Sequence, residues 1–232
     1  GTVAPKRPPV RDRSVHITTL GRFAVTIDGA EVPASIWGSR RSRQLCKRLV
    51  AARGWPVQRE QLFELLWPDE IDNGKLGARL SVQLSAVRRV LGGGINATRE
   101  TVALDLSEVS TDIEALFAAT DGTVAAGLYG GEFLPDDPDE PWAETMRAAA
   151  RAQTADLVRS TAADFRSDER YSDAADLLRH IVGHDRYDDL AHELLVSCLL
   201  DTGDVAAARD AYEARARAMT ELDIDLAPFD AG

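Results

Sequence analysis

The chain has 232 residues, 44% of them hydrophobic and 28% charged, and a formal net charge of −11. This length is typical of two modest domains, each able to bury its own core. No apolar run approaches the roughly 20 residues that cross a bilayer. This excludes a membrane span within the segment, and we expect no membrane contact from it.

The charge is distributed unevenly along the chain. Residues 1–106 contain 17 Lys and Arg against 10 Asp and Glu, a net charge of +7. Residues 107–232 contain 10 against 28, a net charge of −18. A DNA-binding module joined to a protein-facing module would show this asymmetry, and so would two unrelated solvated surfaces. The motifs must decide between these interpretations.

The chain has two cysteines, Cys46 and Cys198, one in each half. Each lies inside a helical apolar pattern, which predicts a buried thiol that packs as a small hydrophobic side chain. Because nothing in the chain depends on a disulfide, we expect the protein to work in a reducing cytoplasm.

The first predicted elements are an arm and a few short strands. Residues 1–13 are rich in Pro and Arg and have no periodicity, which indicates a flexible arm, a linker or the cut end of a longer protein. The β-prone runs 15–20 and 23–27 follow, and Asp28-Gly29 forms a tight turn after them. We therefore expect a small antiparallel sheet.

Three helices and a hairpin are predicted next. Apolar spacing and end signals place the helices at about 39–52, 59–67 and 73–91, and the hairpin at 98–106. Ser39 is expected to cap the first of them. Strands, three helices and a hairpin in this order predict a winged helix-turn-helix domain over residues 14–107, with an extra N-terminal antiparallel sheet.

In such a domain the third helix lies in the major groove of DNA. Gln83 is placed to contact adenine with two hydrogen bonds, whereas Val82 and Ala86 can meet a thymine methyl group. Arg79 and Arg89 can serve either a guanine or a phosphate. Lys75 lies on the same outward face.

Further arginines are predicted to hold phosphates. Arg40, Arg41 and Arg43 lie at the start of the first helix, where backbone N–H groups and the positive end of the helix dipole favour anions. Arg99 is the basic residue of the wing. The candidate DNA-binding residues are therefore Arg40, Arg41, Arg43, Lys75, Arg79, Val82, Gln83, Ala86, Arg89 and Arg99.

Residues 108–232 have an almost entirely helical pattern. Thr111 and Glu114 match a capping box that opens the first of these helices. Further helices are predicted at about 123–128, 142–165, 172–183, 189–202 and 205–222, with a loop over 129–141. This half is expected to be an all-α domain.

The last helices contain a repeat of 34 residues. Its two copies are Tyr171, Ala174 and Leu178, and then Val205, Ala208 and Tyr212. A small residue where two helices cross closely, with a large one a turn later, is typical of tetratricopeptide helix pairs at this period. Such stacks usually present a groove to another protein.

Four stretches of the chain resemble one family of regulators. Residues 78–92 (ARLSVQLSAVRRVLG) resemble the recognition helix of the antibiotic-regulatory-protein (SARP) type of bacterial activators. Residues 20–23 (LGRF) resemble their opening strands, 129–135 (YGGEFLP) the entry of their bacterial transcriptional activator domain, and 221–225 (ELDID) its last segment. The resemblance implies an OmpR-like winged helix joined to a tetratricopeptide-like domain. It also implies a dimer on directly repeated DNA sites and contact with RNA polymerase.

The residues provide no recognisable catalytic or metal site. His180, His184 and His192 have a spacing that can bind zinc, but the glutamate or cysteine partners of zinc motifs do not accompany them. The acidic loop 136–140 lacks the spacing of a calcium loop. No nucleophile is accompanied by a base and an orienting group. We expect no enzyme activity, no metal and no cofactor.

The leading hypothesis is a sequence-specific DNA-binding transcriptional activator. Its partners would be double-stranded DNA, RNA polymerase and a second copy of the chain. The alternative is the C-terminal signalling or scaffold module of a larger sensor protein, in which both domains bind proteins. Only the first hypothesis predicts affinity for duplex DNA that falls by orders of magnitude between roughly 50 and 200 mM salt.

Overall fold

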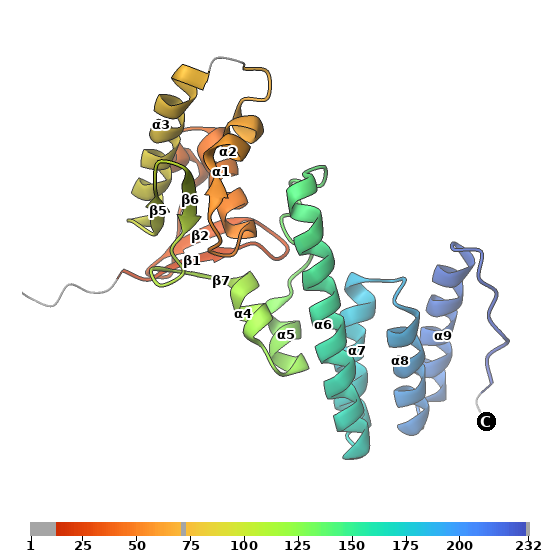
Figure 1. The fold of residues 1–232 in the computed structure, drawn as a ribbon. Coiled ribbons are helices and arrows are strands. Elements are labelled where there is room, and N and C mark those ends of the chain that lie inside the picture. Colours follow the sequence, from red (N-terminus) through yellow and green to blue (C-terminus); the bar gives the residue numbers. More distant parts are fainter. Residues whose placement is uncertain (1–12, 71–72, 231–232) are drawn as a thin grey trace, which may run out of the picture. The chain divides into compact units, whose positions relative to one another are not determined.

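A computed structural model describes residues 13–70 and 73–230 and divides them into two compact units (Figure 1). The first unit contains the described residues up to Thr18 and from Ala24 to Thr111. The second contains Thr19–Phe23 and the described residues from Asp112 onward. The predicted arm lies almost entirely outside the described ranges. Within those ranges, none of the helices has the length and apolar character that crossing a bilayer requires.

The N-terminal sheet of the first unit has four strands in the order β3-β2-β1-β7. Strand β2 lies antiparallel to both β1 and β3, as the sequence predicted. A fourth strand that the sequence did not predict, β7, lies parallel to β1 with Val109 opposite Val15. The strands are β1 (Val15–Thr18), β2 (Ala24–Ile27), β3 (Ala30–Glu31) and β7 (Val109–Thr111).

The helices of this unit form where the sequence predicted them. Ser39 caps α1, since its hydroxyl accepts a hydrogen bond from the Ser42 N–H at 3.1 Å. The inward stripes of α1 and α3, including Leu45, Leu49, Leu80 and Leu84, are buried. The helical segments are the 3₁₀ turn η1 (Ala34–Trp37), α1 (Arg40–Ala51), α2 (Arg59–Leu66) and α3 (Asn73–Leu91).

A second sheet forms the wing, with its strands in the order β4-β6-β5. Its hairpin is displaced from the predicted range, because the first strand, β5, lies before residue 98 and the turn occupies 98–100. Strand β4 has only two residues and gave no detectable sequence pattern. The strands are β4 (Val57–Gln58), β5 (Ile95–Ala97) and β6 (Thr101–Leu104).

The second unit is all-α within the described residues, apart from a single bridge between Leu20 and Phe133. From α6 to α9 each helix packs against the next along the chain (Figure 1). Ala174 and Ala208 are fully buried, as expected for the close-crossing positions of the repeat. The helices are α4 (Asp112–Ala118), α5 (Gly122–Leu128), α6 (Pro141–Ser167), α7 (Tyr171–His184), α8 (Asp189–Asp201) and α9 (Val205–Thr220).

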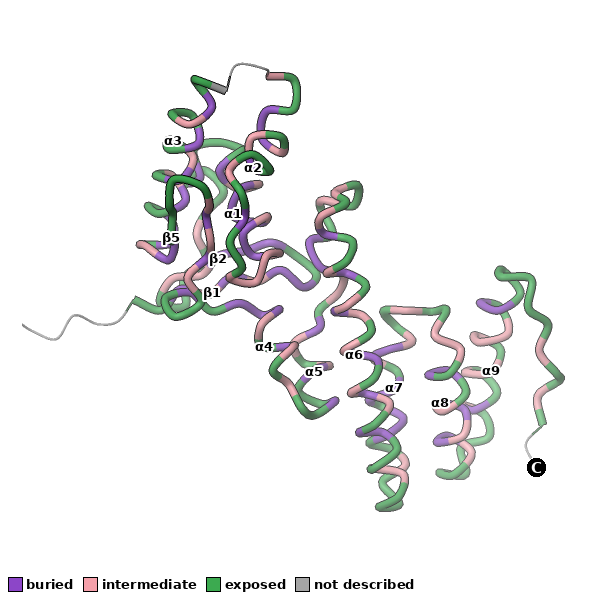
Figure 2. Tube along the Cα trace, in the orientation of Figure 1, coloured by how far each residue is buried: buried purple, intermediate pink, exposed green. Residues whose placement is uncertain are grey.

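The core of these helices is built mainly from small and aliphatic side chains. Buried and exposed positions alternate along each of them with the helical period (Figure 2). Leu178 is buried in this core, and Tyr212 packs against its edge. The ring of Phe229 lies 5.4 Å from that of Tyr212, so the chain after α9 returns to cover this helix.

Residues 19–23 join the second unit through a buried carboxylate. Asp112 accepts hydrogen bonds from the Thr19 N–H at 2.7 Å, the Thr19 hydroxyl at 2.6 Å and the Leu20 N–H at 2.8 Å. At Gly21, with φ of 83°, a Cβ atom would lie 2.5 Å from the carbonyl oxygen of Gly130. Glycine therefore allows the close approach of the two backbones there.

Candidate nucleic-acid interface

One face of α3 is buried and the opposite face is open to solvent. Leu76, Leu80 and Val87 are at most 1% exposed, because residues three and four apart lie on one face of a helix. On the other face the apolar side chain of Val82 is 65% exposed. The structure brings the predicted α3 residues together on this face: Lys75, Arg79 and Arg89 are exposed, and Gln83 and Ala86 are half-buried.

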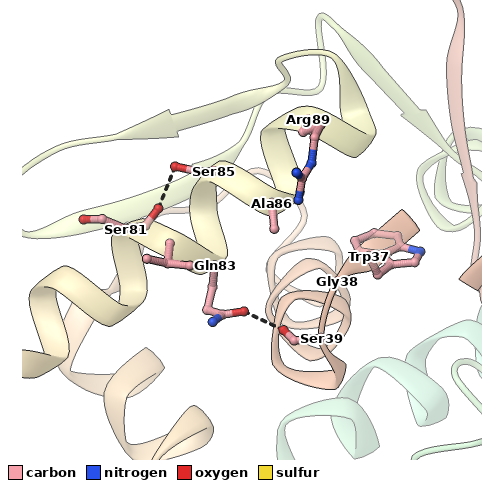
Figure 3. Close-up of a pocket in the computed structure, with 9 residues that line it drawn as sticks. Trp37, Gly38, Ser39, Ser81, Gln83, Ser85, Ala86 and Arg89 are labelled. Atoms are coloured by element: carbon pink, nitrogen blue, oxygen red, sulfur yellow. Dashed lines mark hydrogen bonds between the residues drawn. The ribbon is translucent and has the colours of Figure 1, made fainter. Parts of the chain in front are cut away.

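A hollow of ≈ 520 Å³ lies between α3 and the start of α1 (Figure 3). Trp37, Gly38 and Ser39 form one wall. The other wall is a strip of α3 made of Ser81, Val82, Gln83, Ser85, Ala86 and Arg89. The serine hydroxyls of that strip donate back to the helix: Ser81 to the Gly77 carbonyl at 2.9 Å and Ser85 to the Ser81 carbonyl at 2.8 Å.

A second hollow of ≈ 490 Å³ lies on the other side of the Val82 and Gln83 ridge. It is lined by Arg41 on α1, by Trp67 and Glu70 after α2, and by Arg79 on α3. The ridge therefore stands between two concave surfaces. One holds serine hydroxyls and Arg89, whereas the other holds two arginines and a glutamate.

The three arginines at the start of α1 do not share one environment. Arg40 and Arg41 are exposed, whereas Arg43 is half-buried. The Nε of Arg41 donates to the Leu66 carbonyl at 2.8 Å, and its guanidinium carbon lies 5.9 Å from the centre of the Trp67 ring. These contacts hold Arg41 against the end of α2, where it lines the second hollow.

Glu70 is a member of this surface that the sequence did not reveal. Its carboxylate forms an ion pair with the Arg79 guanidinium. The side chains are 30% and 45% exposed respectively, so water screens the pair only in part. Nine residues separate them across the connection between α2 and α3, so neither helical nor strand periodicity could have indicated this contact.

The wing places Arg99 at an exposed turn. The Thr98 hydroxyl accepts hydrogen bonds from the Glu100 N–H at 3.1 Å and the Thr101 N–H at 2.9 Å, which fixes this turn. Arg59 is another basic side chain beside this turn, since its Nε donates to the Thr98 carbonyl at 3.0 Å. The candidate interface therefore includes a cation at the start of α2, held against the wing turn, that the sequence did not reveal.

The described residues contain no group of three or more His, Cys, Asp and Glu side chains in an arrangement that could hold a metal. The Nε2 of His180 lies 3.1 Å from the Tyr129 carbonyl, and that of His192 lies 3.0 Å from the Arg186 carbonyl. Burial raises the pKa of the Cys46 thiol to about 12. This thiol therefore stays protonated and packs as a hydrophobic side chain.

Comparison with known proteins adds the family. Residues 109–229 match the family model described as bacterial transcriptional activator domain. The fold is similar to a solved structure of Mycobacterium tuberculosis EmbR in complex with a low-affinity phosphopeptide, with a TM-score of 0.70 and 20% sequence identity. That likeness covers 93% of this chain and 62% of the EmbR chain, so this chain spans less than two thirds of its length. No curated protein matches the chain.

The two findings have different weight. At 20% identity the likeness to EmbR shows the fold alone; it confirms the predicted fold class, a winged helix followed by a helical domain. The family match covers 121 of the 232 residues. This protein therefore belongs to the bacterial transcriptional activator domain family, as its resemblance to SARP-type transcriptional activators predicted.

Proposed function

We propose that this transcriptional activator binds specific DNA sequences by placing α3 in the major groove. The observation that carries the proposal is the outward face of α3, where the largely exposed Val82 adjoins the amide of Gln83. An apolar group and an amide in this arrangement match a thymine methyl group and the polar edge of a neighbouring base. Arg79 and Arg89 stand on the same face, within reach of bases or phosphates.

The phosphate contacts are assigned to the exposed cations around that face. Arg40 and Arg41 occupy the first turn of α1, where the positive end of the helix dipole favours an anion. Arg99 extends from the wing turn. Such contacts fix the register of a protein on duplex DNA, whereas contacts with base edges select the sequence.

The helical domain is proposed to bind protein. Helix-pair stacks bury one face of each helix against its neighbours and leave an extended surface for a partner. The many carboxylates in this half repel DNA phosphates but are suited to a protein surface with a complementary charge. We assign to this domain the contact with RNA polymerase and with a second copy of the chain.

The test is selection of bound sequences from random duplex DNA, followed by footprinting and titration at several salt concentrations. We expect a preferred sequence, and an affinity that falls by orders of magnitude between roughly 50 and 200 mM salt. Gln83→Ala should remove the preference at one base pair, whereas Ser85→Ala, a matched truncation on the same helix, should keep it. A chain that selects no sequence and shows no salt-dependent binding would favour the scaffold alternative.

A further inference from the structure

We propose that Ser39 is a specificity-determining residue, because its hydroxyl fixes the orientation of the Gln83 carboxamide. This inference rests on the proposed function, since it concerns how α3 would select a base. Ser39 caps α1 and lies on the wall of the hollow that faces α3. Its Oγ lies 2.7 Å from the Gln83 Oε1, a contact drawn in Figure 3.

The hydrogen bonds around Ser39 determine the direction of its proton. Ser39 Oγ accepts from the Ser42 N–H at 3.1 Å. The buried Ser42 hydroxyl donates its own proton to the carbonyls of Trp37 at 2.6 Å and Ser39 at 2.8 Å. The Ser39 proton can then go to Ser42 Oγ at 3.2 Å or to Gln83 at 2.7 Å, and the shorter bond is the stronger.

The Gln83 atom that faces Ser39 is the amide oxygen Oε1, which can only accept a hydrogen bond. The 2.7 Å separation is the usual length of an O–H···O bond. Ser39 therefore donates to Oε1 and the Gln83 Nε2 is left as a donor. Among the described residues this Nε2 has no hydrogen-bond partner.

A fixed donor restricts the bases that Gln83 can bind. In the major groove guanine presents two acceptors, N7 and O6, whereas cytosine presents only the N4 amino donor. With Oε1 held by Ser39, Gln83 cannot make the two-bond contact with adenine that the sequence predicted. Its remaining donor favours guanine over cytosine at its base pair. A freely rotating carboxamide would offer either group, so it would not distinguish these bases. Ser39 thus acts as a positioning residue for base choice.

Two variants that keep the helix cap separate this role from a structural one. Asp and Asn are both good N-caps and accept the Ser42 N–H as Ser does. In Ser39→Asn the amide can still donate to Oε1. In Ser39→Asp the carboxylate can only accept, so it attracts the Gln83 Nε2 and turns Oε1 outward. The added negative charge lowers affinity for every duplex, but a ratio between bases at one position is insensitive to that loss.

The experiment is sequence selection from random duplexes with the full chain and each variant. The relevant base pair is the one whose preference disappears in Gln83→Ala. We expect guanine over cytosine there for the natural chain and for Ser39→Asn. For Ser39→Asp we expect the guanine-to-cytosine ratio to fall by roughly fivefold to tenfold, the effect of one hydrogen bond. Thermal unfolding checks that both variants remain folded.

Four outcomes overturn the inference, and they are distinguishable. An unchanged ratio in Ser39→Asp, or an equal change in both variants, removes Ser39 from base choice and leaves the proposed function intact. If the natural chain prefers cytosine, Gln83 presents its oxygen to the base. This outcome also leaves the proposed function intact. No selected sequence for the natural chain at all overturns the proposed function, and the inference with it.

Discussion

Arg79 on α3 forms an ion pair with Glu70, which lies between α2 and α3 on the surface that we assign to DNA. This carboxylate engages one nitrogen of the guanidinium and competes with a base or a phosphate for its charge. Glu70 also places a negative charge beside the second hollow. The pair therefore opposes DNA binding, and replacing the glutamate tests whether this surface is the interface.

We predict that Glu70→Gln strengthens binding to all duplexes. Exposed ion pairs are worth about 0.2–1 kcal/mol, so the affinity at low salt should rise about 1.5- to 5-fold. The gain should shrink as salt increases, because salt screens the released charge. Fluorescence titration of a labelled duplex at several salt concentrations measures both effects.

Glu64→Gln is the matched control, because it removes the same charge from an exposed position on α2. Its effect should be smaller, since no ion pair with Arg79 is released. Equal gains in both variants would indicate a general charge effect. An unchanged affinity in Glu70→Gln would remove Arg79 and Glu70 from the interface.

The arginines at the start of α1 are predicted to differ in their contribution to DNA binding. Arg40→Ala should lower the affinity for all duplexes by a similar factor. It should also lower the slope of log affinity against log salt by about one unit, as expected for one lost phosphate contact. Arg43→Ala should leave that slope unchanged. Because Arg43 is half-buried, its loss should instead lower the free energy of unfolding by about 1 kcal/mol.

Salt titrations and urea unfolding of both variants separate the two effects. Arg179→Ala serves as a control for surface arginines, since Arg179 pairs with Asp176 in the helical domain. A smaller salt slope in Arg43→Ala would show that Arg43 also contacts a phosphate, as the sequence predicted for all three arginines. An unchanged slope in Arg40→Ala would show that this side chain does not contact phosphate.

The features that the sequence predicted correctly are local ones. Helix α3 repeats its apolar residues for 19 residues, so its inward and outward faces follow from spacing alone. The Ser39 cap requires only the three residues that follow it. The buried Ala174 and Ala208 could be identified because their neighbours recur 34 residues apart.

The features that were missed depend on partners distant in the sequence. Strands β4 and β7 have two and three residues, and each forms only because a longer strand is already beside it. The Ser39–Gln83 bond joins residues 44 positions apart, and no periodicity relates them. Both residues were singled out, one as a cap and one as a base contact, but their hydrogen bond requires the packed position of α1 against α3.

The Asp112 carboxylate is predicted to be important for the stability of the helical unit. It is 5% exposed and accepts from two backbone N–H groups and a hydroxyl of residues 19 and 20. Asp112→Ala leaves these buried donors without an acceptor, which should lower the free energy of unfolding by about 2–4 kcal/mol. Urea unfolding followed by circular dichroism measures this change.

Asp136→Ala is the control for Asp112→Ala, because Asp136 is an exposed carboxylate of the same unit. Asp136→Ala should lower the free energy of unfolding by no more than about 0.5 kcal/mol. A similar small cost in both variants would show that water replaces the Asp112 hydrogen bonds. In that case residues 19–23 would be held by the backbone contacts of Gly21 and Leu134 instead.

The last prediction concerns the close-crossing position Ala208. This residue is 0% exposed on α9, and α9 packs against α8. Ala208→Leu adds three carbon atoms where there is no space for them, which should lower the free energy of unfolding of the helical unit by about 1–3 kcal/mol. Ala206→Leu makes the same change at an exposed position of α9 and should cost little.

The same variant tests whether the two units act separately. The winged helix has its own core, which includes Leu49, Leu66 and Leu84, and should stay folded in Ala208→Leu. Binding to a single DNA site should then persist, while cooperative binding to paired sites or activation of transcription is lost. Titration of single and paired sites, together with an in vitro transcription assay, measures each. If single-site binding falls in parallel with activation, the two halves fold as one cooperative unit and the predicted domain boundary near residue 107 is wrong.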